Sequence, residues 1–125
     1  LEDVTIGMGD GVSDPEARLI SARTSVARVV SAYVPNGKTV GSDKWIYKLE
    51  WLRILAAHAK GWRHERLALM GDFNIAPFDH DVWDIAAFEG STHVSEPERA
   101  AFRAFEEAGL TDVVRDRAAG YTYWD

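Results

Sequence analysis

An apolar run that ends in polar, chemically active residues is the feature of this sequence that most suggests a functional site. Leu67 to Met70 is apolar, Gly71 follows it, and Asp72 and Asn74 come next, separated by one residue. Such a run predicts a strand buried on both faces, which we place at residues 66–71. Ligands of open α/β sheets bind just beyond the carboxyl ends of the strands, where Asp72 and Asn74 would lie. Asp and Asn also favour turns, so this stretch alone leaves a purely structural role open.

A second strand should end close to Asp72. Residues 28–34 are rich in β-forming apolar side chains, include Tyr33 near their end, and are followed by an Asn-Gly turn signal. A helix is predicted between the two strands, over residues 42–60. Strand–helix–strand order makes the strands parallel, adjacent or nearly so, with their carboxyl ends at the same edge of the sheet. The sequence therefore predicts that Tyr33 and Asp72 lie near each other.

The helix predicted over residues 42–60 carries two basic side chains on a common face. Ser42 can cap its beginning, and Gly61 supplies the stop at its end. Lys44 and Lys48 lie one turn apart on this helix. A solvated stripe is the plainer interpretation of these two lysines when they are considered alone.

The other elements follow from capping and turn signals. A second helix is predicted over residues 95–108, where Ser95 and Glu98 form a capping box. The remaining predictions are an irregular segment at 1–15, a strand at 17–22, a hairpin turn at Thr24-Ser25, a loop at 75–90 with a short helix near Val82-Trp83, one or two helical turns at 110–117, and a β-rich aromatic segment at 121–124.

Composition narrows the class of protein. The chain has 125 residues, 46% of them hydrophobic, which is ordinary for one soluble globular domain. The absence of Cys excludes disulfides, thiolate metal sites and a Cys nucleophile. No apolar run approaches the roughly 20 residues that span a bilayer. The chain opens on Leu1, so we expect that position 1 is not a natural start.

Charge is unevenly distributed along the chain. The formal net charge of -6 argues against nucleic-acid binding by bulk charge alone. Residues 36–60 have a basic excess, whereas acidic residues dominate 72–116. This arrangement suits a site that holds a polyanion beside a cation, and it equally suits ordinary solvated surface. Asp79-His80-Asp81 does not predict a metal site, because neighbouring side chains point in different directions and no further ligands are evident.

Four motifs, in this order, resemble the exonuclease III family of DNA-repair nucleases, within the endonuclease/exonuclease/phosphatase superfamily. They are Tyr33-Val34-Pro35-Asn36-Gly37, the helical Lys44 and Lys48, Gly71-Asp72-Phe73-Asn74-Ile75-Ala76-Pro77, and Tyr121-Thr122-Tyr123-Trp124-Asp125. The resemblance implies an α/β (α+β) fold, part of a two-sheet β-sandwich flanked by helices. Residues 1–125 would be one domain, the central portion of a longer one. The family's metal-binding Glu would precede Leu1, and its catalytic His would follow Asp125.

The resemblance also implies a function. Such enzymes are Mg²⁺-dependent phosphodiesterases, with Mn²⁺ as the alternative cation, and they act on duplex DNA. They cut beside abasic sites and remove nucleotides from 3′ ends. We accordingly expect a cytoplasmic monomer that does not contact membranes. Metal-assisted phosphodiester hydrolysis needs oxygen ligands and donors aimed at the developing charge, and a carboxylate, a carboxamide and a phenol supply some of these.

Individual roles follow from the same motifs. Asp72 would activate or polarise the attacking water, and Asn74 would hold Asp72 or the scissile phosphate. Both are the expected metal ligands within this chain. Tyr33 would donate to the phosphate as charge builds on its oxygens. The expected DNA contacts are Arg18, Asn36, Lys44 and Lys48 on the backbone, and Tyr123 and Trp124 in the pocket for the base-less sugar.

Two alternatives stay open at this point. The first is another phosphoesterase of the same superfamily, of the sphingomyelinase or inositol-phosphate phosphatase type, which would share the Gly-Asp-x-Asn motif. The second is a non-catalytic binding fragment, because the resemblance places key family residues outside this chain. The lysine-bearing helix and the terminal aromatic residues favour a DNA substrate over the first alternative.

Overall fold

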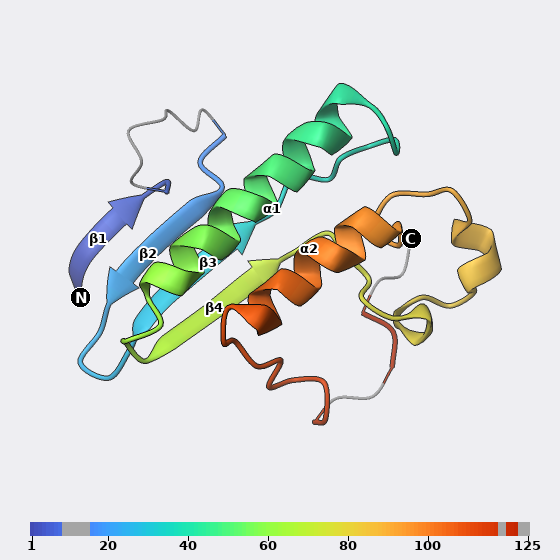
Figure 1. The fold of residues 1–125 in the computed structure, drawn as a ribbon. Helices are drawn as coiled ribbons and strands as arrows, with labels where there is room; N and C mark the ends of the chain where they lie inside the picture. Colours follow the sequence, from blue (N-terminus) through green and yellow to red (C-terminus); the bar gives the residue numbers. More distant parts are fainter. Residues whose placement is uncertain (9–15, 118–119, 123–125) are drawn as a thin grey trace.

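The computed structural model describes residues 1–8, 16–117 and 120–122, which form one four-stranded sheet with two helices on one of its faces (Figure 1). The strands are β1 (Glu2–Ile6), β2 (Leu19–Arg23), β3 (Arg28–Tyr33) and β4 (Leu67–Asp72), in that spatial order. The helices are α1 (Asp43–Gly61) and α2 (Glu96–Glu107), with short 3₁₀ helices η1 (Asp79–Asp81) and η2 (Ile85–Phe88) between β4 and α2. The predicted α/β class is confirmed.

The pairing of β3 with β4 confirms the central prediction from the sequence. β1, β2 and β3 pair antiparallel, whereas β3 and β4 are parallel and adjacent, joined by α1 as the crossover. The hairpin between β2 and β3 turns at Thr24, whose N–H donates to the carbonyl of Ala27 at 2.8 Å. Both strands that flank the candidate site therefore end at the same edge of the sheet.

The core lies between the sheet and the two helices. Val30 and Ala32 of β3 face the buried side of α1, which carries Leu52 and Leu55. Burying each large aliphatic side chain contributes roughly 1.5–3 kcal/mol, so α1 is held mainly by packing. α2 joins this core through Phe105, which meets the ring of Phe73 edge-on at 5.7 Å. The segment directly after β4 is thus fixed by α2.

The opposite face of the sheet is exposed, and this corrects the prediction of a strand buried on both faces. Met70 on β4 and Ile20 on β2 are exposed, and no other element among the described residues covers them. β4 is also the edge strand of the described sheet. An apolar run predicts a strand, but it does not reveal which face of that strand another element covers.

Several local predictions need correction. β1 occupies residues 2–6, which were predicted to be irregular, and all five of its residues are exposed. Residues 110–117 form bends and one turn in place of helix, and the short helices of the 75–90 loop are η1 and η2, on either side of Val82. The two long helices match their predicted ranges within one or two residues. Within the described residues, neither helix is long and apolar enough to cross a membrane.

Candidate functional site

The ends of β3 and β4 form the base of the candidate site. Tyr33 and Asp72 are paired neighbours in the parallel register. The pairing continues one step further, because the N–H of Val34 donates to the carbonyl of Asp72 at 2.9 Å. Tyr33 and Asp72 are both exposed, so the phenol and the carboxylate are open to a ligand at this edge.

Gly71 is required by the close approach of the two strands. Its φ is 138°, a value that favours glycine, and a Cβ atom built there would lie 1.8 Å from the carbonyl oxygen of Ala32. No side chain fits that space without moving β3 away from β4. The first residue of the Gly-Asp-x-Asn motif therefore sets the strand spacing that brings Asp72 beside Tyr33.

Asn74 holds Asp72 and the end of β3 at the same time. Its backbone N–H donates to Oδ1 of Asp72 at 2.9 Å, and its side-chain Nδ2 donates to the carbonyl of Val34 at 2.8 Å. Asn74 has a φ of 50°, a left-handed conformation that Asn tolerates better than most residues. The expected contact between Asn74 and Asp72 is thus present, made by the backbone and not by the amide side chain.

Arg18 lies against Tyr33. Its guanidinium carbon is 5.0 Å from the centre of the Tyr33 ring, a cation–π arrangement, and its Nη1 donates to the Tyr33 carbonyl at 3.3 Å. Arg18 also forms an ion pair with Glu16. The structure therefore places the expected arginine directly beside the expected phenol.

The three remaining residues that were predicted to contact the DNA backbone lie in different environments. Asn36 is exposed, and its Oδ1 accepts from the N–H of Lys38 at 3.0 Å, which fixes the turn after β3. Lys44 is exposed near the beginning of α1. Lys48 is fully buried, which corrects both the solvated stripe and the direct contact with DNA that we expected of it. Its ammonium bonds inside the protein because Gly37 and the start of α2 enclose it.

A buried network around Glu98 occupies the space behind the strand ends. Glu98 forms an ion pair with Lys48 and accepts hydrogen bonds from Thr92 Oγ1 at 2.7 Å, the His93 N–H at 2.9 Å and Ser95 Oγ at 2.5 Å. Burial raises the pKa of Glu98, but these donors outweigh it and the pKa lies below its usual value. Glu98 is therefore ionised, and the predicted capping box is not formed because its carboxylate points into this network.

His93 is a part of this region that the sequence did not single out. The side chain is buried, and its Nδ1 lies 2.5 Å from the Asn74 carbonyl. Burial lowers the pKa of His93, so the ring is neutral at pH 7 and Nδ1 is the protonated nitrogen that donates to Asn74. The 92–93 segment thus supports the turn that carries Asn74. Only spatial proximity reveals this role, because the flanking sequence holds no histidine motif.

An open groove of about 580 Å³ lies beside the site. It runs between the segment after β3, with Asn36 and Lys38, and the loop that carries Trp83, Thr92 and His93. Tyr33 and Asp72 do not line this groove. The strand ends and the groove are therefore neighbouring surfaces that share the turn at Asn36.

The residues at the strand ends suit a hard cation. Asp72 and Asn74 offer carboxylate and amide oxygens, the ligand type that Mg²⁺ prefers, and Mg²⁺ commonly takes only one or two protein carboxylates plus water and substrate oxygens. No group of three or more His, Asp or Glu side chains that could hold a metal occurs in the described part of the chain. The donor set fits a shared site completed by other oxygen ligands.

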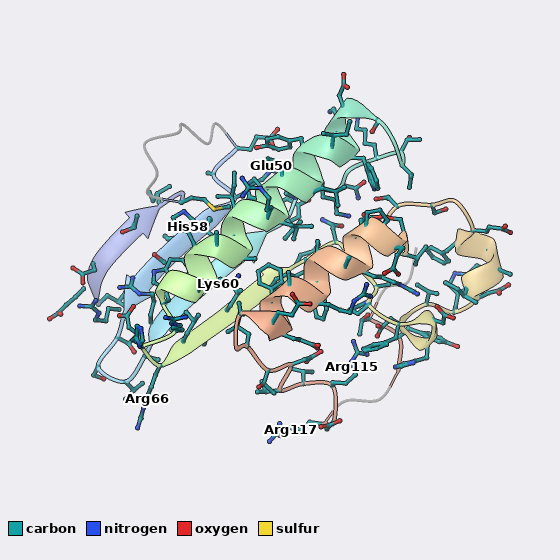
Figure 2. The ribbon with its side chains drawn as sticks, in the orientation of Figure 1. Glu50, His58, Lys60, Arg66, Arg115 and Arg117 are labelled. Carbon is teal, nitrogen blue, oxygen red and sulfur yellow. The ribbon has the colours of Figure 1, made fainter. Side chains whose placement is uncertain are left out.

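Asp79, His80 and Asp81 have structural partners. Asp79 pairs with Arg99 at 2.8 Å, and the ring of His80 stacks on Phe78. Asp81 is fully buried, and Arg115 donates to its carboxylate with two nitrogens, at 2.6 and 3.2 Å. In Figure 2, Arg115 reaches from the segment after α2 toward the loop that carries η1.

The Asp81 turn also contacts the last described segment. The N–H of Thr122 donates to the backbone carbonyl of Asp81 at 3.0 Å. Tyr123 and Trp124, the two predicted aromatic contacts, lie outside the described residues. The structure therefore places the residue directly before them beside η1.

Comparison with known proteins gives consistent likenesses over nearly the whole chain. No protein-family model matches the sequence. The chain is 32% identical over 127 residues to the DNA repair nuclease APEX1 of Danio rerio, covering 98% of this chain and 41% of that protein. It is 29% identical over 126 residues to the exodeoxyribonuclease of Bacillus subtilis, covering 97% and 50%. The chain thus spans about half the length of these relatives or less.

Solved structures agree with these likenesses. The 3′-5′ exonuclease NExo of Neisseria meningitidis has a TM-score of 0.88 and 37% identity, over 98% of this chain and 49% of that one. A second structure, of the Neisseria 3′ phosphatase NExo bound to a product DNA hairpin, has a TM-score of 0.88 and 35% identity, over 97% and 48%. Each likeness concerns about half of the solved protein.

Proposed function

We propose, from the confirmed resemblance of this chain to the exonuclease III family, that it is part of a Mg²⁺-dependent nuclease that hydrolyses phosphodiester bonds in duplex DNA. We further propose abasic sites and 3′ ends as its substrates, in base-excision repair. The observation that carries the proposal is the parallel register that sets Tyr33 beside Asp72. Support for DNA comes from the relatives, which are named as DNA nucleases, and from a neighbour bound to a DNA hairpin.

The residues at the strand ends can share the work of hydrolysis. Asp72 is held by the Asn74 N–H and can orient the water that adds across the P–O bond. The exposed Tyr33 hydroxyl can donate to a phosphate oxygen as negative charge develops on it. Asp72 and Asn74 are the residues of this chain that we expect to hold Mg²⁺, which supplies charge neutralisation at the phosphate. We propose that Arg18 beside Tyr33, Asn36 in the turn after β3 and the exposed Lys44 of α1 contact the DNA backbone.

The test uses duplex DNA with one abasic site and a 5′ label, with Mg²⁺ or with chelator. The 125-residue chain is compared with a version extended at both ends by the flanking segments of the Bacillus subtilis relative. We expect the extended version to cut the DNA in Mg²⁺ only. Asp72→Ala should lower its rate by at least about 10²-fold, because a positioned general acid–base group contributes that much or more.

The matched control is Asp116→Ala, which removes an exposed carboxylate in the segment after α2 and should leave cleavage unchanged. A duplex with a recessed 3′ end distinguishes exonuclease from abasic-site activity. An inositol phosphate and a phospholipid serve as rival substrates. Turnover of a rival substrate with no cutting of either duplex would overturn the DNA assignment, and full activity of Asp72→Ala would overturn the assignment of the site.

A further inference from the structure

We infer that Lys48 and Glu98 form a positioning pair that fixes the two strand-end turns of the candidate site relative to each other. Lys48 Nζ donates to the carbonyl of Asn36 at 3.1 Å and to the carbonyl of Asn74 at 2.6 Å. A single nitrogen atom therefore joins the turn after β3 to the turn after β4. The inference rests on the proposed function, because it gives this buried pair a task in that same site.

All three N–H donors of the Lys48 ammonium are used inside the protein. A lysine has three N–H donors, and here they meet Asn36, Asn74 and the carboxylate of Glu98. The side chain is fully buried in a narrow space, because a Cβ atom on Gly37 would lie 2.9 Å from its Cδ. Lys48 thus acts on a substrate only through the two turns that it holds.

Glu98 extends the connection to two more segments. Its carboxylate accepts from Thr92 and His93, which precede α2, and from Ser95 at the N-cap of α2. Thr92 and His93 also line the open groove, as Asn36 and Lys38 do. The strand-end turns, the groove wall and the start of α2 therefore meet at one buried ion pair.

Stability alone does not explain this arrangement. Well-packed apolar side chains of similar volume can often replace a buried ion pair without loss of stability. Such side chains fill the space, but they offer no donor to the carbonyls of Asn36 and Asn74. A displacement of about 1 Å in a catalytic site can cost about 10²-fold in rate, so loosened turns should reduce catalysis even in a stable protein.

The experiment therefore uses the double variant Lys48→Met/Glu98→Leu in the 125-residue chain and in the extended version. Its matched control is Lys60→Met/Glu96→Leu, which makes the same changes at exposed positions of the same two helices. We expect the double variant to fold with a lower unfolding midpoint, because the His93 N–H and the carbonyls of Asn36 and Asn74 lose a hydrogen-bond partner. Its kcat should fall about 10²-fold with little change in KM. The control should match the unsubstituted protein. A stable double variant with an unchanged kcat would overturn the inference.

Amide hydrogen exchange supplies a readout that needs no catalysis. The N–H of Lys38 and the N–H of Asn74 are bonded within the two turns, to Asn36 Oδ1 and Asp72 Oδ1. Both amides should lose protection in the double variant and keep it in the control. Unchanged protection would overturn the inference, whether or not the extended chain cuts DNA. Failure of the inference is thereby distinguished from failure of the proposed function.

Glu98→Gln serves if the double variant does not fold. It keeps the volume of the side chain and one acceptor oxygen, but it weakens the hold on Lys48. We expect a folded protein with a smaller fall in kcat, an unchanged KM, and partial loss of amide protection at Asn74. A folded Glu98→Gln variant with unsubstituted kcat and unchanged protection would contradict the inference.

Discussion

Among the described residues, the carboxylates of Glu98 and Asp81 are fully buried, and they differ in how far their cationic partners are exposed. Glu98 meets Lys48, whose side chain is also fully buried, behind the ends of β3 and β4. Asp81 meets Arg115, whose side chain is 26% exposed, at the turn that contacts the C-terminal segment. The first pair is sealed inside the protein, and the second keeps one edge at the solvent.

This difference predicts how each region tolerates damage. A charge that loses its partner in a sealed site cannot recover water, so the whole desolvation cost remains. A guanidinium at the surface can turn toward solvent, and Arg115 also rests on the ring of Phe78 at 4.7 Å. A substitution behind the strand ends should therefore lower the free energy of unfolding more than a comparable substitution at the Asp81 turn.

The largest effect is expected for the single substitution Lys48→Met. It leaves the carboxylate of Glu98 buried without a cation, and breaking one side of a buried pair costs about 3–5 kcal/mol. Urea unfolding measures the free energy of unfolding, with Lys60→Met as the exposed control on the same helix. A loss as small as that of the control would mean that water reaches Glu98, and the contrast between the two regions would fail.

A smaller effect is expected for Asp81→Asn. The substitution keeps the shape of the side chain and removes the charge that two nitrogens of Arg115 contact. Loss of a buried hydrogen-bond partner costs about 1–3 kcal/mol, and Arg115 limits the loss because it can reach water. The same urea titration applies. A loss equal to or larger than that of Lys48→Met would reverse the order that burial of the cation predicts.

The strand-end geometry could be predicted from the sequence because local rules determine it. The order strand, helix, strand requires a parallel pair, and the motif residues at the two strand ends then fall side by side, as Tyr33 and Asp72 do. β1 was missed because its residues lack a buried apolar face and carry no periodic signal. The exposed face of β4 was missed because a run of apolar residues does not reveal what packs against it.

The Lys48–Glu98 pair could not be predicted, because the two residues are 50 positions apart and each has a satisfactory local explanation. A lysine on a helix is usually solvated, and a Glu three residues after a Ser reads as a capping box. Tertiary structure overrides both patterns when α2 packs against α1. Gly37 gives the one hint in hindsight, since its lack of a side chain leaves room for the Lys48 stem.

The smallest effect is expected when the pH is lowered. This experiment compares the carboxylates of Glu98 and Asp81 without substituting Lys48 or Arg115. Burial raises the pKa of Glu98 and of Asp81, but their hydrogen bonds outweigh it, so both pKa values lie below the usual 4.5 and 3.8. In the unfolded chain these groups take up protons as the pH falls through the usual pKa values. In the folded protein they take up protons only at a lower pH, because their pKa values are lowered. Their contribution is therefore complete above about pH 4.5 and is lost as the pH falls toward the lower folded values.

Unfolding midpoints measured between about pH 7 and pH 3 test this sign. Glu98→Gln and Asp81→Asn should each reduce the fall of the unfolding midpoint below about pH 4.5, since each removes one group with a lowered pKa. Glu96→Gln, at an exposed carboxylate that pairs with Arg103, is the matched control. A decline that stays as steep in both buried-site variants as in the control would show that neither carboxylate is preferentially ionised in the folded protein. The acid sensitivity would then have to arise elsewhere, and the lowered pKa values of Glu98 and Asp81 in the folded protein would be contradicted.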